Sequence, residues 1–238
     1  MNLDVMVFSA HPDDAELSMG GTIAKFSKAG IRVGLIDLTK GELGTRGTAE
    51  SRQKEAFQAA IILKAAIREN LGIPDGNIKR NKDNLMRLIM SIRKYRPKII
   101  FAPYINDRHP DHIHTSRLAK EAMFSAGLVK VKTFDKEVAQ EPYRPSKLFY
   151  YMQTYTFEPT FIVDITDTYE HKMNAVKAYG SQFYNPKSVE PETFISKPEF
   201  IDYIESRTQF YGFQIGKKFG EPFYSEEKLE YDLVSLFK

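Results

Sequence analysis

The chain has 238 residues, of which 42% are hydrophobic and 27% are charged, values close to those of ordinary globular proteins. It contains no cysteine, which excludes disulfides and thiol catalysis and leaves histidine, aspartate and glutamate to bind any metal. The net charge of +3 comes without a long lysine or arginine run, so we expect no nucleic-acid partner. Neither a signal core nor an apolar run of membrane-spanning length is present, and we expect a soluble, cytoplasmic protein without a membrane partner.

Strand and helix patterns alternate through the first half of the chain, which is typical of βαβ units and a parallel sheet. We predict strands over 3–10, 31–38, 65–71 and 98–102, and helices over 15–29, 49–63, 81–95 and 114–127. The glycine-punctuated segment 39–48 follows a predicted strand. Loops at such positions often carry function, although a flexible connector would have the same composition.

The part of the chain from Tyr143 onward is rich in aromatic residues, with 22 of the 30 in the sequence. Packing is the default role for these side chains, with a subunit interface or a sugar-stacking wall as alternatives. We predict strands over 147–152 and 160–164, helices over 169–179 and 200–211, a surface loop or lid over 183–198, and an irregular tail from Gly216. No linker or repeat divides the chain, so the sequence predicts a single domain over residues 1–238, whose C-terminal part, 143–238, contributes lid and interface.

The first candidate site follows the first predicted strand, where Ala10-His11-Pro12-Asp13-Asp14 leads into a helix. Ligands bind at the carboxyl ends of strands in open α/β sheets, and imidazole and carboxylate suit a divalent metal such as zinc. His11 and Asp14 are three residues apart, a spacing that points both side chains to one side in a first helical turn. Asp13 would then remain free for proton transfer. A solvated helix cap explains the same residues equally well.

A second segment of the same kind follows the strand predicted over 98–102. It contains His109-Pro110-Asp111-His112, and four of the five histidines in the chain lie in these two segments. Two strand ends could place three ligands around one ion and leave a coordination position open, as in a catalytic zinc site. The coincidence would have to occur twice at one face of the sheet, so the two segments together favour a metal site over helix caps.

With these motifs the chain resembles the zinc-dependent N-acetylglucosaminyl deacetylases of the PIG-L/LmbE family. The resemblance rests on the two histidine motifs, the loop 41–47 with Glu50 and Arg52 after it, and the later segments 179–183 and 219–223. It implies a Rossmann-like α/β domain with a mostly parallel twisted sheet and helices on both faces. It also implies a homo-oligomer, often a hexamer. Within the family the chain looks most similar to the bacterial branch that deacetylates N-acetylglucosaminyl malate during bacillithiol synthesis.

The resemblance also implies which residues form the metal centre. His11, Asp14 and His112 would be the ligands of Zn²⁺, and Fe²⁺ would suit the same set. Asp13 would act as the general base.

The resemblance implies roles for further residues of the two segments. His109 would be the proton donor or the oxyanion partner, oriented by Asp111. An acidic residue at this position is also favoured by the helix dipole alone. Arg52 matches a substrate-contacting arginine. Arg108 sits beside the second motif in the closer relatives and is a second candidate for contacting an anionic substrate.

The residues suggest amide hydrolysis. The resemblance implies that the amide is the acetamide of a GlcNAc-containing, anionic small molecule, with N-acetylglucosaminyl malate as the specific candidate. Two alternatives remain open at the level of sequence. One is a zinc amidase acting on another amide, such as a thiol conjugate. The other is a non-catalytic α/β protein that binds a sugar or a nucleotide.

Overall fold

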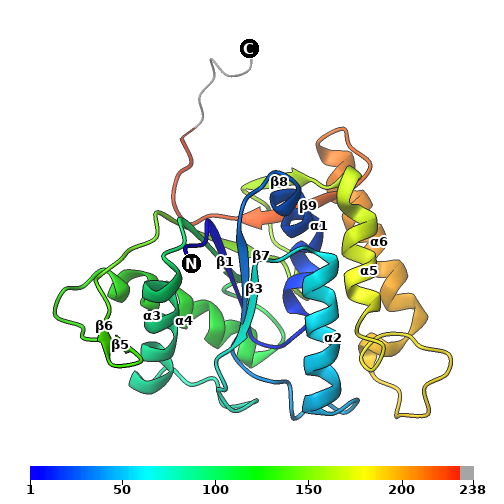
Figure 1. Cartoon of the computed structure of the whole chain (residues 1–238). Coiled ribbons are helices and arrows are strands. Elements are labelled where there is room, and N and C mark those ends of the chain that lie inside the picture. The colour runs from blue at the N-terminus through cyan, green and yellow to red at the C-terminus, as the bar shows by residue number, and fades with distance from the viewer. Residues whose placement is uncertain (231–238) are drawn as a thin grey trace.

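A computed structural model describes residues 1–230 of the chain (Figure 1). Its main sheet has seven strands: β1 (Val5–Ser9), β2 (Val33–Asp37), β3 (Ile67–Asn70), β4 (Ile99–Pro103), β7 (Lys147–Tyr151), β8 (Phe161–Asp164) and β9 (Gly220–Tyr224). The strand order is β3-β2-β1-β4-β7-β9-β8. Neighbouring strands from β3 to β7 are parallel, and β9 runs antiparallel to both of its neighbours. The predicted α/β fold with a mostly parallel sheet is confirmed.

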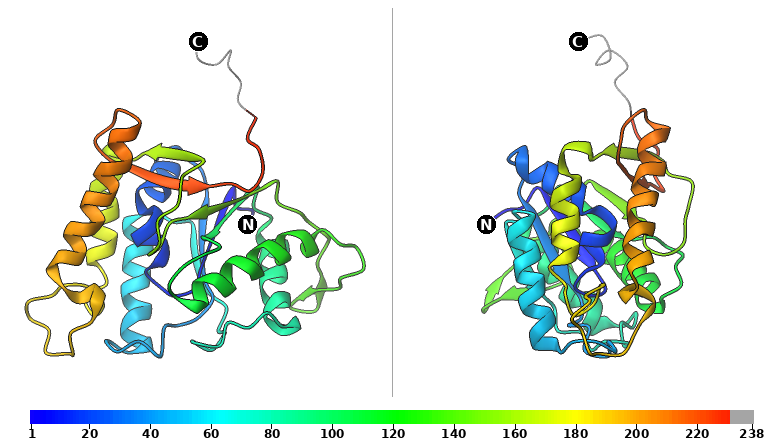
Figure 2. Two further views of the ribbon diagram at one scale, coloured as in Figure 1. Left: turned by 180° about the vertical axis from the view of Figure 1, so that it is seen from behind. Right: turned by 90° about the vertical axis from the view of Figure 1, so that its right-hand side faces the viewer.

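Within residues 1–230, six α-helices cover the two faces of this sheet (Figure 2). They are α1 (Asp14–Lys28), α2 (Ala49–Ile62), α3 (Lys82–Tyr95), α4 (Pro110–Ala126), α5 (Tyr169–Lys177) and α6 (Pro198–Gln214). α3 and α4 pack on one face, whereas α1, α2, α5 and α6 pack on the other. None of the helices within residues 1–230 combines the length and the apolar character needed to cross a membrane.

Strand β1 explains why the sheet needs helices on both faces. Its side chains alternate between the faces, as in any strand: Val5 and Val7 join one apolar cluster, and Met6 and Phe8 join the other. All four are buried. A strand covered on both sides therefore consists of a continuous apolar run, as is typical of parallel sheets.

The order of the strands brings the two histidine segments together. The chain moves outward from β1 through β2 to β3 and then returns to β4 on the other side of β1. The loops after β1 and β4 therefore leave the sheet side by side at its topological switch point, which is where open α/β sheets bind ligands.

The predicted irregular tail from Gly216 is wrong for β9, which lies between β7 and β8 in the sheet. Gly220, Glu221 and Pro222 interrupt the apolar pattern expected of an interior strand. In the fold Glu221 is fully buried and forms an ion pair with Lys172 Nζ at 2.7 Å. A buried ion pair thus takes the place of an apolar side chain. For this reason the sequence of β9 lacks the apolar pattern of a strand. Residues 231–238 of this tail lie outside the described residues.

The same ion pair stabilises a kink in α1, the helix that carries the first candidate site. Met19 leaves helical geometry, with φ −141° and ψ 21°. Glu221 accepts hydrogen bonds from the N–H groups of Gly21 (3.0 Å) and Thr22 (2.7 Å) after the kink, and Lys172 Nζ donates to the carbonyl oxygen of Leu17 (2.7 Å) before it. These contacts satisfy the backbone groups that the kink frees, and they fix the first turn of α1 against the sheet.

Candidate active site

The first histidine segment forms a tight turn between β1 and α1. Asp13 adopts φ 113° and ψ −25°, a left-handed conformation that non-glycine residues rarely use. The turn is held by the N–H of His11, which donates to Asp14 Oδ2 at 2.9 Å, and by Arg52 Nη2, which donates to the carbonyl oxygen of Pro12 at 2.8 Å. Backbone strain of this kind is stored at functional sites, and here it separates the side chains of two adjacent aspartates.

The two segments place His11, Asp14 and His112 around one point, as expected from the sequence. One potential ligand atom from each residue lies within 4.8 Å of the other two. His112 Nε2 is 3.2 Å from Asp14 Oδ1, and His11 Nδ1 is 3.8 Å from Asp14 Oδ2. All three side chains are buried. Two imidazole nitrogens and a carboxylate oxygen are a donor set that suits zinc or iron(II).

Each of these two histidines is held by carboxylates on its other ring nitrogen. His112 Nδ1 lies 2.8 Å from Asp107 Oδ1. His11 Nε2 lies 3.1 Å from Asp75 Oδ1 and 3.4 Å from Asp111 Oδ2. Carboxylates in such positions fix the tautomer and the orientation of imidazoles that bind metals. The nitrogens left to bind a cation are His11 Nδ1 and His112 Nε2, the two that face the shared carboxylate.

The excess of carboxylates also changes the pKa of both imidazoles in the metal-free protein. Burial lowers the pKa of His11, but hydrogen bonds with Asp111 and Asp75 raise it to about 10. Burial likewise lowers the pKa of His112, and the charge of Asp14 raises it to about 9. The site therefore attracts positive charge, and because metals bind neutral imidazole, a bound cation would replace protons. The residues present fit a divalent cation.

His109 lies beside these residues but has a different environment. Its ring centroid is 4.8 Å from that of His11 and 5.0 Å from that of His112, and it is exposed to the cavity. Its Nδ1 accepts a hydrogen bond from the backbone N–H of Asp111 at 3.2 Å. Burial and the positive charges of the two neighbouring imidazoles lower the pKa of His109. In the neutral ring, the contact with the Asp111 N–H leaves the proton on Nε2.

The contacts of Asp111 differ from those expected from the sequence. Its carboxylate accepts a hydrogen bond from the N–H of Gly76 at 2.9 Å and lies against His11. The hydrogen bond to the ring of His109 comes from the backbone N–H of Asp111. The reason is the start of α4: Asp111 lies in its first turn, where the free N–H groups point toward the capping residue, His109. A carboxylate oxygen of Asp111 lies within 4.8 Å of a ring nitrogen of His109, and its charge acts to raise the pKa of that ring.

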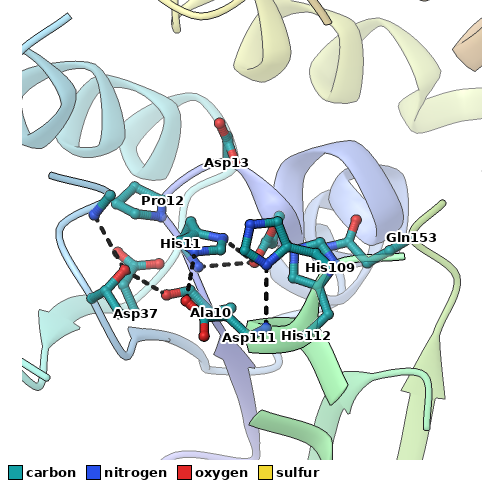
Figure 3. A network of polar contacts seen from close by, with 12 residues as sticks. Ala10, His11, Pro12, Asp13, Asp37, His109, Asp111, His112 and Gln153 are labelled. Carbon is teal, nitrogen blue, oxygen red and sulfur yellow. Dashed lines mark hydrogen bonds and ion pairs between the residues drawn. The ribbon is translucent and has the colours of Figure 1, made fainter. Parts of the chain in front are cut away.

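Asp13 points away from the three histidines (Figure 3). Its carboxylate lies against Arg52. Asp13 Oδ2 is 3.1 Å from Arg52 Nη2, and both side chains are buried. Burial raises the pKa of Asp13, the charge of Arg52 lowers it, and the charge of Asp14 raises it, so that the pKa lies above its ordinary value. A carboxylate of this kind is suited to taking up and releasing a proton near neutral pH.

Arg52 is already engaged by the protein. Besides Asp13 and the Pro12 carbonyl oxygen, it donates from Nη1 to the carbonyl oxygen of Gly41 at 2.8 Å. Arg52 thus ties the glycine-rich loop to the turn before α1 while lining the cavity. Its contact with substrate stays a prediction.

A cavity of about 780 Å³ opens above the site. The polar floor carries the histidines, and the outer wall combines apolar and charged side chains. Its apolar part is formed by Leu17, Phe194, Ile195, Phe200, Tyr203 and Ile204, and its charged part by Arg108, Lys197, Glu199 and Arg207. The cavity therefore has room for a polar reacting group at its floor and a larger portion of substrate above it.

The loop predicted over 183–198 supplies part of this wall and contains the short 3-10 helix η2 (Phe194–Ser196). It is tied to the glycine-rich loop, because Arg46 Nη2 donates to Ser188 Oγ at 2.7 Å and the N–H of Gly47 donates to Glu190 Oε1 at 2.7 Å. The guanidinium of Arg108 lies over the ring of Phe194, 5.0 Å from its centroid. The loop and Arg108 thus meet at the cavity, and the function of the loop as a lid stays a prediction.

Sequence reasoning missed Asp75 and Asp107 as groups that hold the histidines. Both follow predicted strands: Asp75 lies in the turn after β3, and Asp107 lies between β4 and α4. Their position after strand ends was a signal that could have identified them. Nothing in the sequence, however, indicates which histidine each carboxylate contacts.

Comparisons with known proteins are consistent with this geometry. Residues 6–123, which include both histidine segments, match the family model described as PIG-L: GlcNAc-PI de-N-acetylase. A diacetylchitobiose deacetylase from Thermococcus kodakarensis is 30% identical over 227 residues, which are 91% of this chain and 80% of that protein. A 4-oxalmesaconate hydratase from Pseudomonas putida is 28% identical over 74% of this chain and 73% of its own length. The crystal structure of the conserved protein TT1542 from Thermus thermophilus has a TM-score of 0.87 and 37% identity, covering 97% of this chain and 98% of that one.

Proposed function

The chain belongs to the PIG-L family of deacetylases, and from this premise we propose that it hydrolyses the acetamide of a GlcNAc-containing small molecule. In this proposal a divalent cation is held by His11, Asp14 and His112. The observation that carries the proposal is the position of these three donors. They meet at the floor of a large cavity, beside Asp13 and His109, two groups able to move a proton.

A cation bound by this donor set supplies Lewis acidity, which polarises a carbonyl group and lowers the pKa of water from 15.7 to about 7. The protein supplies the proton transfers. Asp13, with its raised pKa, accepts a proton from the water that attacks the acetyl carbon. It returns that proton to the nitrogen of the sugar as the C–N bond breaks, so that acetate and a free amine are the products.

His109 stabilises the negative charge that develops on the acetyl oxygen. Its Nδ1 is engaged by the N–H of Asp111, so its Nε2–H is free to donate to that oxygen. A neutral donor performs this task without a positive charge next to the cation, where like charges repel. Of the two roles that the resemblance implies for His109, this is that of the oxyanion partner, and it stays a prediction. A well-placed donor of this kind is typically worth about 3–4 kcal/mol in the transition state.

The specific substrate that we propose is N-acetylglucosaminyl malate. Arg108, supported by its stack on Phe194, and Lys197 both line the cavity and would face the malate carboxylates. A guanidinium recognises a carboxylate through two parallel hydrogen bonds. The aromatic side chains of the same wall favour a second candidate, a substrate with another sugar in place of malate, because sugar rings stack on such surfaces.

A panel of N-acetylated sugars tests this proposal. Release of free amine is measured from N-acetylglucosaminyl malate, diacetylchitobiose and free N-acetylglucosamine, with metal content determined on the same sample. We expect kcat/KM to be at least about 10-fold higher for the malate conjugate than for free N-acetylglucosamine, as one charge-assisted hydrogen bond would give.

Each other result has a distinct meaning. Preference for diacetylchitobiose would contradict the malate assignment but leave the deacetylase in place. Inactivity toward all three sugars by a metal-loaded protein would favour a different amide. Hydration of 4-oxalmesaconate without any release of amine would contradict the deacetylase function itself. A protein that binds no metal and is insensitive to chelators would favour the non-catalytic alternative.

A further inference from the structure

We propose that the side-chain amide of Gln153 donates a hydrogen bond to the acyl oxygen of the substrate. Gln153 would thus be a second donor beside His109, on a residue that the sequence motifs do not include. This inference rests on the proposed deacetylation, because it concerns the oxygen of the amide that is cleaved.

The side-chain amide of Gln153 has a hydrogen-bond partner for its oxygen but none for its nitrogen within residues 1–230. Ser18 Oγ donates to Gln153 Oε1 at 2.7 Å, and both residues are buried, with 2% and 8% of their surfaces exposed. Gln153 Nε2 is also buried, and it has no hydrogen-bond partner among residues 1–230. Buried amide nitrogens are nearly always paired in native proteins. An unpaired one in a cavity wall therefore indicates an acceptor that arrives with the ligand.

The main chain around Gln153 is fixed on both sides. Gln153 follows directly after Tyr151 and Met152 at the carboxyl end of β7. Arg207 Nη1 donates to the carbonyl oxygen of Gln153, and the N–H of Thr154 donates to Asp107 Oδ2 at 2.8 Å. Asp107 is the same carboxylate that orients His112 through its other oxygen. Asp107 therefore links the main chain next to Gln153 to His112, a proposed metal ligand.

The acceptor must lie at the floor of the cavity. Gln153 lines the cavity together with His109 and His112, and Figure 3 shows its side chain directed toward these two histidines. The reacting carbonyl group is the part of the substrate that belongs there. The terminal torsion of glutamine is broad, so a small rotation can turn the N–H toward that oxygen while the other end keeps its bond to Ser18. Donors fixed in advance around a developing oxyanion are the arrangement that accelerates acyl transfer.

The test is the Gln153→Met variant, which keeps the length of the side chain but removes the donor. We expect its kcat on the preferred N-acetyl sugar to fall by about 100-fold, with metal content and melting temperature as in the wild type. The dissociation constant of the deacetylated product should not change, because the product lacks the acyl oxygen. Gln140→Met is the matched control: that amide donates to the Met90 carbonyl oxygen at 3.0 Å, outside the cavity, and the variant should retain wild-type kcat.

Several results would overturn the assignment. A kcat for Gln153→Met within about threefold of the wild-type value would contradict the assignment, because that change is smaller than the loss of one ordinary hydrogen bond. If Gln153→Met bound the deacetylated product more weakly, the Gln153 amide would contact a sugar hydroxyl instead of the acyl oxygen. If the variant lost metal, the role of Gln153 would be structural. A wild-type protein that releases no amine from any sugar would show the failure of the proposed function separately. Calorimetric titration with N-acetylglucosamine would still test Gln153 in that case, and equal affinity of wild type and variant would contradict the contact.

Discussion

Replacing Asp13 by asparagine is expected to lower kcat by about 10²–10⁴-fold, the contribution typical of a general base, without loss of metal. Asparagine has the same shape, tolerates the left-handed backbone of this position (φ 113°), and its amide oxygen can still accept a hydrogen bond from Arg52. It cannot, however, take up a proton. The measurements are kcat at saturating substrate and the metal content of the same preparation.

The matched control for this variant is Asp202→Asn, which makes the same chemical change at an exposed position on α6. It should retain the kcat of the wild type. If Asp13→Asn lost metal and activity together, Asp13 would be a ligand and its assignment as the base would be wrong. A kcat close to the wild-type value would equally remove Asp13 from the mechanism.

Replacing His11 by alanine is expected to remove both metal and activity. Losing a carboxylate that merely orients a ligand weakens metal binding by about 10–100-fold, so losing the ligand itself should weaken it by more than about 100-fold. The change also leaves the Asp75 and Asp111 carboxylates, which lie 3.1 and 3.4 Å from His11 Nε2, without their shared imidazole. Metal affinity is measured by competition with a chelator, and activity is measured across added zinc concentrations.

His171→Ala provides the control for this second variant, because His171 lies on α5, apart from the cavity residues. It should bind one metal ion per chain with wild-type affinity. A His11→Ala protein that retained stoichiometric metal would show that the cation, if any, is bound elsewhere. The contrast between Asp13→Asn, which keeps metal, and His11→Ala, which does not, separates the two roles within one short turn.

Much of the fold could be predicted because the physical signals were local. Apolar runs such as that of β1 alternate with amphipathic helices, and this pattern specifies a parallel sheet. The histidine segments were identifiable because polar ligand types directly follow two such runs. The strand β9 was missed because its stability depends on the Glu221–Lys172 ion pair, a contact between residues that are 49 positions apart.

The details of the site were less predictable for a related reason. Whether Asp111 contacts His109 through its carboxylate or through its main chain depends on where α4 begins, and the predicted start at residue 114 was four residues later than the observed start at Pro110. Asp75 reaches His11 across 64 positions, because a turn folds back over the end of the sheet. The homo-oligomer, the cytoplasmic location and the substrate arginines stay predictions.

We propose that two segments far apart in the chain share one cation. Zinc K-edge X-ray absorption spectroscopy of the zinc-loaded wild-type protein measures the ligands of that cation. We expect two imidazole nitrogens at about 2.0–2.1 Å and a carboxylate oxygen at about 2.0–2.2 Å, with one imidazole fewer in His112→Ala. A zinc shell with at most one imidazole in the wild-type protein would contradict it.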